Sequence, residues 1–102
     1  MSYRVKFLPE ADFDMDGIEE YLSQFYANTA RNFYSKLKNQ TTSLQTTPYM
    51  YPAYDADPYF RRIVIDDFLL FYSVEEKCNL VIIHRIFHSK RDISQQLLSY
   101  RE

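Results

Sequence analysis

The first residues of the chain alternate between apolar and charged side chains, which is the pattern of a half-exposed β-strand. In YRVKFLP (residues 3–9), cations separate Tyr3, Val5 and Phe7, and Pro9 ends the run. Proline lacks the backbone N–H that a strand uses for pairing, so a strand stops where it occurs. We therefore expect a strand that ends by Pro9.

Two segments with helical periodicity follow. Apolar residues recur at spacings of four and three at Ala11, Met15, Ile18, Leu22 and Phe25. Similar spacings return at Ala27, Ala30, Phe33, Leu37, Thr41 and Leu44. Each set lies on one face of an α-helix, and the acids near the start of the first helix suit its dipole. Because only a short break near residues 26–28 separates the two helices, we expect an antiparallel hairpin.

The second half of the chain is rich in β-formers. Residues 47–60 contain three prolines and five aromatics, which is typical of a loop with at most one short edge strand. The runs RRIVI (61–65), FLLFYSV (68–74) and LVIIHRIF (80–87) are joined by connections short enough for hairpins, so they predict an antiparallel meander. DISQQLL, from Asp92, has the spacing of a capping box and predicts a short C-terminal helix.

This order of elements predicts a single α+β domain that spans residues 1–102. Two amphipathic helices pack on one face of a small, mainly antiparallel sheet in such an arrangement. A length of 102 residues suits one hydrophobic core. With 46% hydrophobic and 25% charged residues, the composition is that of a folded globular protein and excludes a disordered chain.

Composition also excludes several kinds of chemistry. Gly17 is the only glycine, which rules out the glycine-rich phosphate loops of ATPases and dehydrogenases. Cys78 is the only cysteine, so it has no internal disulfide partner and no second cysteine for a zinc cage. We expect no cofactor. No apolar run approaches the ~20 residues that cross a bilayer, and the N-terminus lacks the pattern of a signal peptide, so we expect a cytoplasmic protein with no membrane partner.

Charge is distributed unevenly over a molecule whose net charge is only -2. Acids crowd the start of the chain at Glu10, Asp12, Asp14, Asp16, Glu19 and Glu20. Cations gather in the second half at Arg61, Arg62, Arg85, Lys90 and Arg91. A local basic patch can therefore form on a weakly acidic protein.

The stretch HRIFHSKRD (residues 84–92) holds both histidines of the chain. On a strand His84 and His88 would face the same side but lie about 13 Å apart, at ~3.3 Å per residue. Two ligands of one zinc ion each need to lie within ~2 Å of the metal, so the pair cannot form a metal site by itself. We expect His84 to be a buried neutral histidine with one hydrogen bond.

The end of this stretch has two interpretations. His88, Lys90 and Arg91 can be solvated residues after a strand. Alternatively, they join Arg61 and Arg62 in a cationic cluster that holds a phosphate or an acidic segment of a partner. The positions of these residues along the chain leave both interpretations open.

Together these segments resemble the RelE/ParE superfamily of bacterial toxins from type II toxin–antitoxin pairs. The resemblance runs from YRVKFLPEADFDMDGIEEYL through ANTARNFYSKL and RRIVIDDFLLFYSV to VIIHRIFHSKRD, which is most of the chain. Its most specific features are Arg62, Tyr72 and the ending formed by Arg85, Ile86, Phe87, His88, Arg91 and Asp92. The resemblance implies the same layout of two helices on one face of a small sheet.

The superfamily has two activities. RelE-like members are ribosome-dependent endoribonucleases that cut mRNA, and ParE-like members poison DNA gyrase. RelE-like enzymes carry an arginine in the middle strand where this chain has Leu69, and the terminal tyrosine used for acid–base work in some of them is absent, although His88 can stand in. With a pI of about 5.6, the chain also lacks the broad positive charge that would favour its association with a ribosome, whose surface is rich in phosphate. These departures favour the ParE-like branch.

Three hypotheses follow for function. The first is a non-hydrolytic toxin that acts on DNA gyrase and is neutralised by a cognate antitoxin. The second is a ribosome-dependent mRNA endoribonuclease, and only in this case would catalysis fall to Arg62, Arg85, His88 and Arg91. The third is an inactive family member that serves as a binding module. Whether the protein is an enzyme depends on which of the three is correct.

Contact residues are expected in two places. For a phosphate or a target surface they are Arg61, Arg62, Lys90 and Arg91. For the antitoxin they are the side chains of the aromatic loop, Tyr49, Met50, Tyr51 and Tyr54. Antitoxins of this kind lay a C-terminal segment across the toxin's helices and sheet edge. The alternative, that the loop covers the protein's own core, is equally open.

Overall fold

A computed structural model describes residues 2–26, 28–90 and 97. Its elements are β1 (Arg4–Phe7), α1 (Pro9–Leu22), α2 (Thr29–Ser43), β2 (Arg61–Ile65), β3 (Phe68–Glu75), the 3-10 turn η1 (Glu76–Cys78) and β4 (Leu80–His88). The predicted order of one strand, two helices and three further strands is confirmed, and so is the α+β class. The C-terminal helix predicted from Asp92 lies outside the described residues, apart from Leu97.

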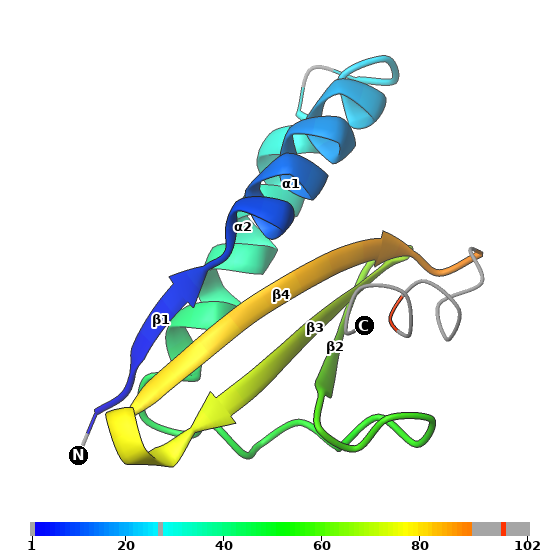
Figure 1. The fold of residues 1–102 in the computed structure, drawn as a ribbon. Coiled ribbons are helices and arrows are strands. Elements are labelled where there is room, and N and C mark those ends of the chain that lie inside the picture. The colour runs from blue at the N-terminus through cyan, green and yellow to red at the C-terminus, as the bar shows by residue number, and fades with distance from the viewer. Residues whose placement is uncertain (1, 27, 91–96, 98–102) are drawn as a thin grey trace.

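The four strands form one open sheet in the order β1-β4-β3-β2. β2 with β3 and β3 with β4 are antiparallel, which confirms the predicted meander. β1 instead lies parallel to β4, with Arg4 opposite Leu80 and Phe7 opposite Ile83. Since β4 continues to His88, its last residues extend beyond the end of β1 (Figure 1).

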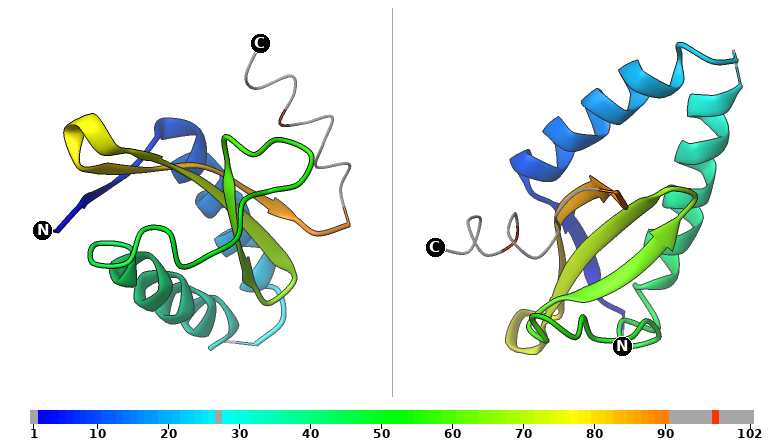
Figure 2. Two further views of the ribbon diagram at one scale, coloured as in Figure 1. Left: turned by 90° about the horizontal axis from the view of Figure 1, so that it is seen from below. Right: turned by 90° about the vertical axis from the view of Figure 1, so that its right-hand side faces the viewer.

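The helical hairpin covers one face of the sheet (Figures 1 and 2). α1 begins with Pro9 in its first turn, where the missing N–H costs no hydrogen bond. Residues from both helices and from the sheet form the helix-side core, which includes Ala11, Ile18, Phe33, Leu37, Leu44, Ile63, Leu70, Tyr72, Val81, Ile83 and Ile86. The prediction that Phe25 belongs to the core-facing stripe of the first helix was wrong. α1 ends at Leu22, and the Phe25 side chain is 55% exposed.

The opposite face of the sheet carries a smaller apolar cluster of Phe60, Phe71, Phe87 and Leu97. A register shift between Phe71 and Tyr72 of β3 places Phe71 opposite Arg85 but Tyr72 opposite Ile83, so His84 is an extra residue in β4. Such a bulge breaks the alternation of side chains. His84 and His88 were expected to face the same side, but the His84 ring lies against Phe60 of this cluster whereas the His88 ring lies against Phe68 of the helix-side core.

No helix in the described part of the chain combines the length and the apolar character needed to cross a membrane.

Candidate functional site

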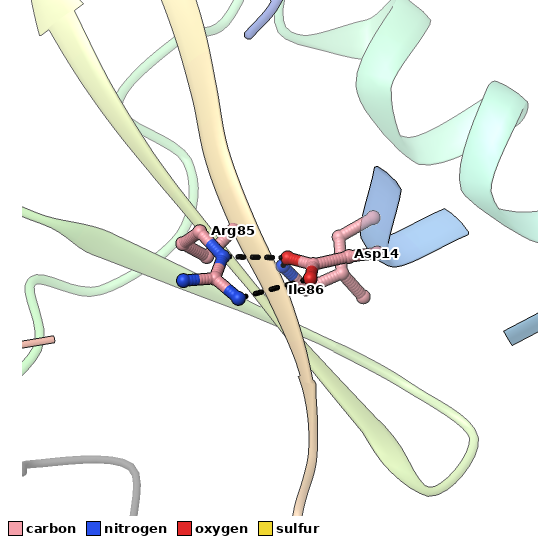
Figure 3. Close-up of polar contacts among 3 residues, drawn as sticks. All are labelled: Asp14, Arg85 and Ile86. Carbon is pink, nitrogen blue, oxygen red and sulfur yellow. Dashed lines mark hydrogen bonds and ion pairs between the residues drawn. The ribbon is translucent and has the colours of Figure 1, made fainter. Parts of the chain in front are cut away.

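The part of β4 beyond β1 is held by a side chain of α1. The Asp14 carboxylate accepts hydrogen bonds from the Arg85 guanidinium, at 2.7 Å from Nε and 3.0 Å from Nη2. It also accepts one from the backbone N–H of Ile86 at 3.0 Å, where the next residue of a strand would otherwise pair (Figure 3). Asp14 thus replaces the missing end of β1 and anchors α1 to β4. We call this arrangement the Asp14–Arg85 clasp.

The clasp is largely shielded from water. The Asp14 side chain is 10% exposed and that of Arg85 21% exposed. The Arg85 guanidinium also stacks over the ring of Phe87, 4.5 Å from its centroid. A two-point hydrogen bond and a stacked aromatic face together fix the plane of the guanidinium. Arg85 is therefore committed to an internal carboxylate.

His84 is buried, as expected, and its Nε2 lies 2.8 Å from the hydroxyl of Ser73. Its ring packs edge-on against Phe60 and Tyr59, with centroids 5.1 and 5.9 Å away. An apolar pocket with a hydroxyl partner is the environment of a structural histidine. The expected burial of His84 is confirmed, and Ser73 supplies a hydrogen-bond partner.

His88 lies at the end of β4 and is partly exposed. Its ring meets that of Phe68 edge to face at 5.3 Å, and its Nδ1 accepts a hydrogen bond from the backbone N–H of Lys90 at 3.2 Å. Lys90 is exposed to solvent. Arg91 and Asp92 lie outside the described residues.

Arg61 and Arg62 begin β2 and point to opposite faces of the sheet. Arg61 donates to the carbonyl of Tyr51 at 2.6 Å and lies over the Tyr49 ring, 4.9 Å from its centroid. It therefore holds the aromatic loop in place. Arg62 sits in the same row as Arg85, with Phe71 of β3 between them. Two strand spacings of ~4.8 Å separate their backbones by about 10 Å.

The predicted cations do not all converge. Arg61 lies opposite Tyr72 and His88 opposite Phe68. These two partners are four residues apart along β3, or about 13 Å at ~3.3 Å per residue. Arg61 therefore lies well away from the His88–Lys90 end of β4, and among the predicted cations that the structure describes only Arg62 and Arg85 share a row.

The aromatic loop divides into buried and exposed residues. Tyr51 packs against the helix-side core and Tyr54 against the cluster on the other face. Tyr49 and Met50 are 45% and 55% exposed. The hydroxyl of Tyr49 hydrogen-bonds to Glu76, which raises the pKa of Tyr49 to about 12. Of the four residues proposed to contact an antitoxin, two therefore stabilise the protein itself.

Tyr72 shows how the loop is attached to the sheet. Its hydroxyl donates to the carbonyl of Pro48 at 2.7 Å while its ring is fully buried in the helix-side core. Burial raises the pKa of Tyr72 to about 12, because the phenolate would lose its hydration. The tyrosine that carries part of the family resemblance is thus a structural residue in this fold.

A pocket beside α1 was not foreseen from the sequence. It has a volume of about 320 Å³ and is lined by Phe13, Asp14, Gly17, Ile18, Tyr21, Phe68, Arg85, Ile86 and His88. Phe13 and Tyr21 are 77% and 47% exposed, although both belong to an otherwise amphipathic helix. The sequence does contain a pattern that could have indicated this pocket. Phe13, Gly17 and Tyr21 are four residues apart, so they form a stripe on α1 beside the stripe that faces the core.

Comparison with known proteins gives a family. A family model described as the ParE toxin of the type II toxin–antitoxin system parDE matches residues 5–93. No curated protein matches the chain.

Solved structures give the fold. A chain of the chromosomal ParDE system from P. aeruginosa has a TM-score of 0.72 at 17% identity, covering 87% of this chain and 98% of that one. A mutant of the E. coli toxin RelE in the free state has a TM-score of 0.69 at 13% identity, covering 99% and 98%. A RelBE toxin–antitoxin complex from Mycobacterium tuberculosis has a TM-score of 0.61 at 15% identity, covering 86% and 99%. At these identities the likeness is one of fold.

Proposed function

The chain belongs to the ParE toxin family of type II toxin–antitoxin systems, and from this premise we propose that it inhibits growth by binding DNA gyrase and is neutralised by a cognate antitoxin. Structurally similar proteins include both ParDE and RelBE systems, and several were solved as toxin–antitoxin complexes. The choice of a protein target over mRNA rests on the chemistry of the sheet surface.

The observation that carries this choice is the Asp14–Arg85 clasp. Cleavage of RNA needs cations that are free to stabilise charge as it develops on the scissile phosphate. Arg85 instead gives two donors to Asp14, within a pair that is mostly shielded from water. A phosphate would have to displace that carboxylate before it could use the same donors.

Position 69 in β3 also favours a protein target over mRNA. RelE-like enzymes have an arginine at this position, whereas this chain has Leu69, which packs on the cluster of Phe60, Phe71 and Phe87. His84, the other titratable residue of β4 near this row, is buried against Ser73. The residues of the sheet face opposite the helices are therefore mostly apolar and largely buried around Phe60, Phe71 and Phe87, so this face offers few hydrogen-bond donors to a phosphate.

One observation favours the ribosome-dependent endoribonuclease as a second candidate. Arg62 and Arg85 share a row of the sheet, and His88 is partly exposed at the end of β4. Together with Arg91 they would surround a scissile phosphate, with His88 as the acid or base. This arrangement requires Arg85 to leave the clasp.

Two assays on the purified protein separate the candidates. We expect it to inhibit DNA supercoiling by gyrase at near-stoichiometric amounts and to leave ribosome-bound transcripts intact. In cells, His88→Ala should remain as toxic as the parent. Transcripts cut by the parent but not by His88→Ala would overturn the proposal in favour of the endoribonuclease. Harmless expression without any antitoxin would instead indicate an inactive binding module.

A further inference from the structure

The end of the helical hairpin carries three exposed aromatic side chains. Tyr21 lies in the last turn of α1, and Phe25 and Tyr26 follow that helix. Their side chains are 47%, 55% and 80% exposed. We call these three residues the hairpin tip. Figures 1 and 2 show that this end of the hairpin projects away from the sheet. Soluble proteins rarely leave neighbouring large apolar side chains uncovered unless they bind a partner.

Hydrogen bonds and a ring contact hold the hairpin tip in place. The Phe25 N–H donates to the Leu22 carbonyl at 3.1 Å. The Tyr26 carbonyl accepts from the N–H of Thr29, the first residue of α2, at 3.0 Å. The rings of Tyr21 and Phe25 meet edge to face, with their centroids 5.2 Å apart. Because these aromatic side chains are fixed before binding, they lose little conformational entropy when a partner covers them.

The helices that carry the hairpin tip are also joined to each other. The hydroxyl of Tyr34 in α2 lies 3.3 Å from the Met15 carbonyl oxygen and 3.2 Å from the Glu19 carboxylate, both in α1. This bridge fixes one helix against the other. The hairpin tip is therefore presented by a rigid support.

The charge beside the hairpin tip limits the kinds of partner that it can bind. Glu19 and Glu20 are exposed in the last turn of α1, and the first cation after them in the chain is Arg31. Carboxylates repel the phosphates of nucleic acids and of anionic lipids. They also repel each other when two copies of the same surface meet. The hairpin tip therefore fits a protein partner with a positively charged surface.

The shape of the hairpin tip favours a folded partner over a flexible segment. Peptide segments bind in grooves, and the antitoxin contact implied by the family resemblance is of that kind. Phe25 and Tyr26 lie outside the pocket beside α1, at the projecting end of the hairpin. A projecting surface becomes buried only when its partner supplies the concave side, which a folded protein such as the target can do.

We propose that the hairpin tip inserts into a positively charged pocket of DNA gyrase and provides the main contact with the target. Phe25 and Tyr26 bury their rings in that pocket, and Glu20 pairs with a lysine or arginine at its rim. The inference rests on the proposed function, because it takes gyrase as the target.

Binding of the full chain to purified DNA gyrase, measured by calorimetry, tests the proposal. Phe25→Ser should weaken binding about 10-fold or more and reduce the inhibition of supercoiling to match, because it removes an anchoring ring. Phe13→Ser is the matched control, since Phe13 is a 77% exposed phenylalanine of α1 outside the hairpin tip. It should bind within about twofold of the parent. Circular dichroism checks folding, and if Phe25→Ser does not fold, Tyr26→Ser replaces it.

A second pair of variants tests the charge beside the hairpin tip. Glu20→Lys should weaken gyrase binding about 3- to 10-fold at low salt, and the loss should shrink at high salt because the contact is exposed. Asp55→Lys makes the same charge change at an exposed position of the aromatic loop and should bind within about twofold of the parent.

The antitoxin encoded beside this chain gives an independent readout. Phe25→Ser and Glu20→Lys should bind it within about twofold of the parent, because a peptide segment occupies grooves rather than the projecting hairpin tip. Weaker antitoxin binding together with unchanged gyrase binding would assign the hairpin tip to the antitoxin and overturn the proposal.

The remaining outcomes separate this inference from the proposed function. Parent protein that neither binds gyrase nor inhibits supercoiling contradicts the proposed function and the hairpin tip together. If the parent binds gyrase and Phe25→Ser, or its replacement, binds equally well, the hairpin tip is overturned and gyrase remains the target. An equal loss of gyrase binding in Phe13→Ser places the contact along α1 as a whole, which also overturns the proposal.

Discussion

Removal of the Asp14 carboxylate should destabilise the fold more than any ordinary substitution of an exposed acid on α1. Asp14→Ala deletes three hydrogen bonds, two from Arg85 and one from the backbone of Ile86. It leaves a cation and a strand N–H without their acceptor in a site where the Arg85 side chain is only 21% exposed. The contact between α1 and the end of β4 is lost with them.

The size of the effect lies between two limits. Breaking a buried ion pair costs ~3–5 kcal/mol, and breaking an exposed one costs ~0–1 kcal/mol. Exposures of 10% for Asp14 and 21% for Arg85 place the clasp nearer the buried limit. We therefore expect Asp14→Ala to lower the free energy of unfolding by about 2–4 kcal/mol, out of the ~5–15 kcal/mol typical of a domain. Asp14→Asn keeps an acceptor for Ile86 and should cost about 1–2 kcal/mol.

Urea unfolding followed by circular dichroism at the helix band measures this change. A double-mutant cycle with Arg85→Ala isolates the pair, and we expect a coupling energy of roughly 1–3 kcal/mol, because the two side chains contact each other directly. The matched control is Asp12→Ala, an exposed acid one half-turn earlier, which should cost under about 0.5 kcal/mol. An Asp14→Ala protein as stable as this control, or additive effects in the cycle, would refute the role given to the clasp.

Three further predictions concern stability. Tyr72→Phe should lower the free energy of unfolding by about 1–2 kcal/mol, since it removes the hydrogen bond to Pro48. The pKa of Tyr72 is raised to about 12 in the folded protein, so the neutral hydroxyl contributes fully to stability below the unfolded pKa of about 10. That contribution is lost as pH rises from about 10 to about 12. In urea titrations over this range, Tyr72→Phe should therefore lose less stability than the parent. Gly17→Ala should raise the free energy of unfolding by ~0.5–1 kcal/mol in the same assay. Ser73→Ala should lower it by about 1–2 kcal/mol, because it removes the hydroxyl partner of the His84 ring.

Local periodicity was sufficient to predict most of the fold. The runs 61–65, 68–74 and 80–87 correspond to β2, β3 and β4 within one residue, because apolar β-branched runs bounded by turns have few alternatives. The parallel pairing of β1 with β4 could not be predicted in this way. Those strands are more than 70 residues apart, and the alternation in residues 3–9 indicates a strand without indicating its partner.

The site was harder to predict because its key residues look ordinary in the sequence. Asp14 is one of six acids at the start of the chain, and nothing in their spacing distinguishes it. Its role depends on the length of β1, which stops at Phe7 and leaves the N–H of Ile86 to be satisfied from elsewhere. The bulge at His84 was hidden for a similar reason, since an extra residue in one strand is defined only by its pairing with another.

The clasp also yields a prediction about activity. If Arg85 must leave Asp14 before it can contact a phosphate, cleavage would be reduced by the coupling energy of the pair, and roughly 1–3 kcal/mol corresponds to about 5- to 160-fold. An Asp14→Asn variant weakens that hold while keeping the size of the side chain. In a RelE-like enzyme it should therefore cut ribosome-bound mRNA faster than the parent, as measured by primer extension. For a toxin that acts on gyrase we expect no cleavage from either protein and a similar inhibition of supercoiling at a temperature where both are folded. Faster cleavage by Asp14→Asn would show that Arg85 is a catalytic residue that the hydrogen bonds to Asp14 inhibit. It would contradict the conclusion that the clasp has only a structural role.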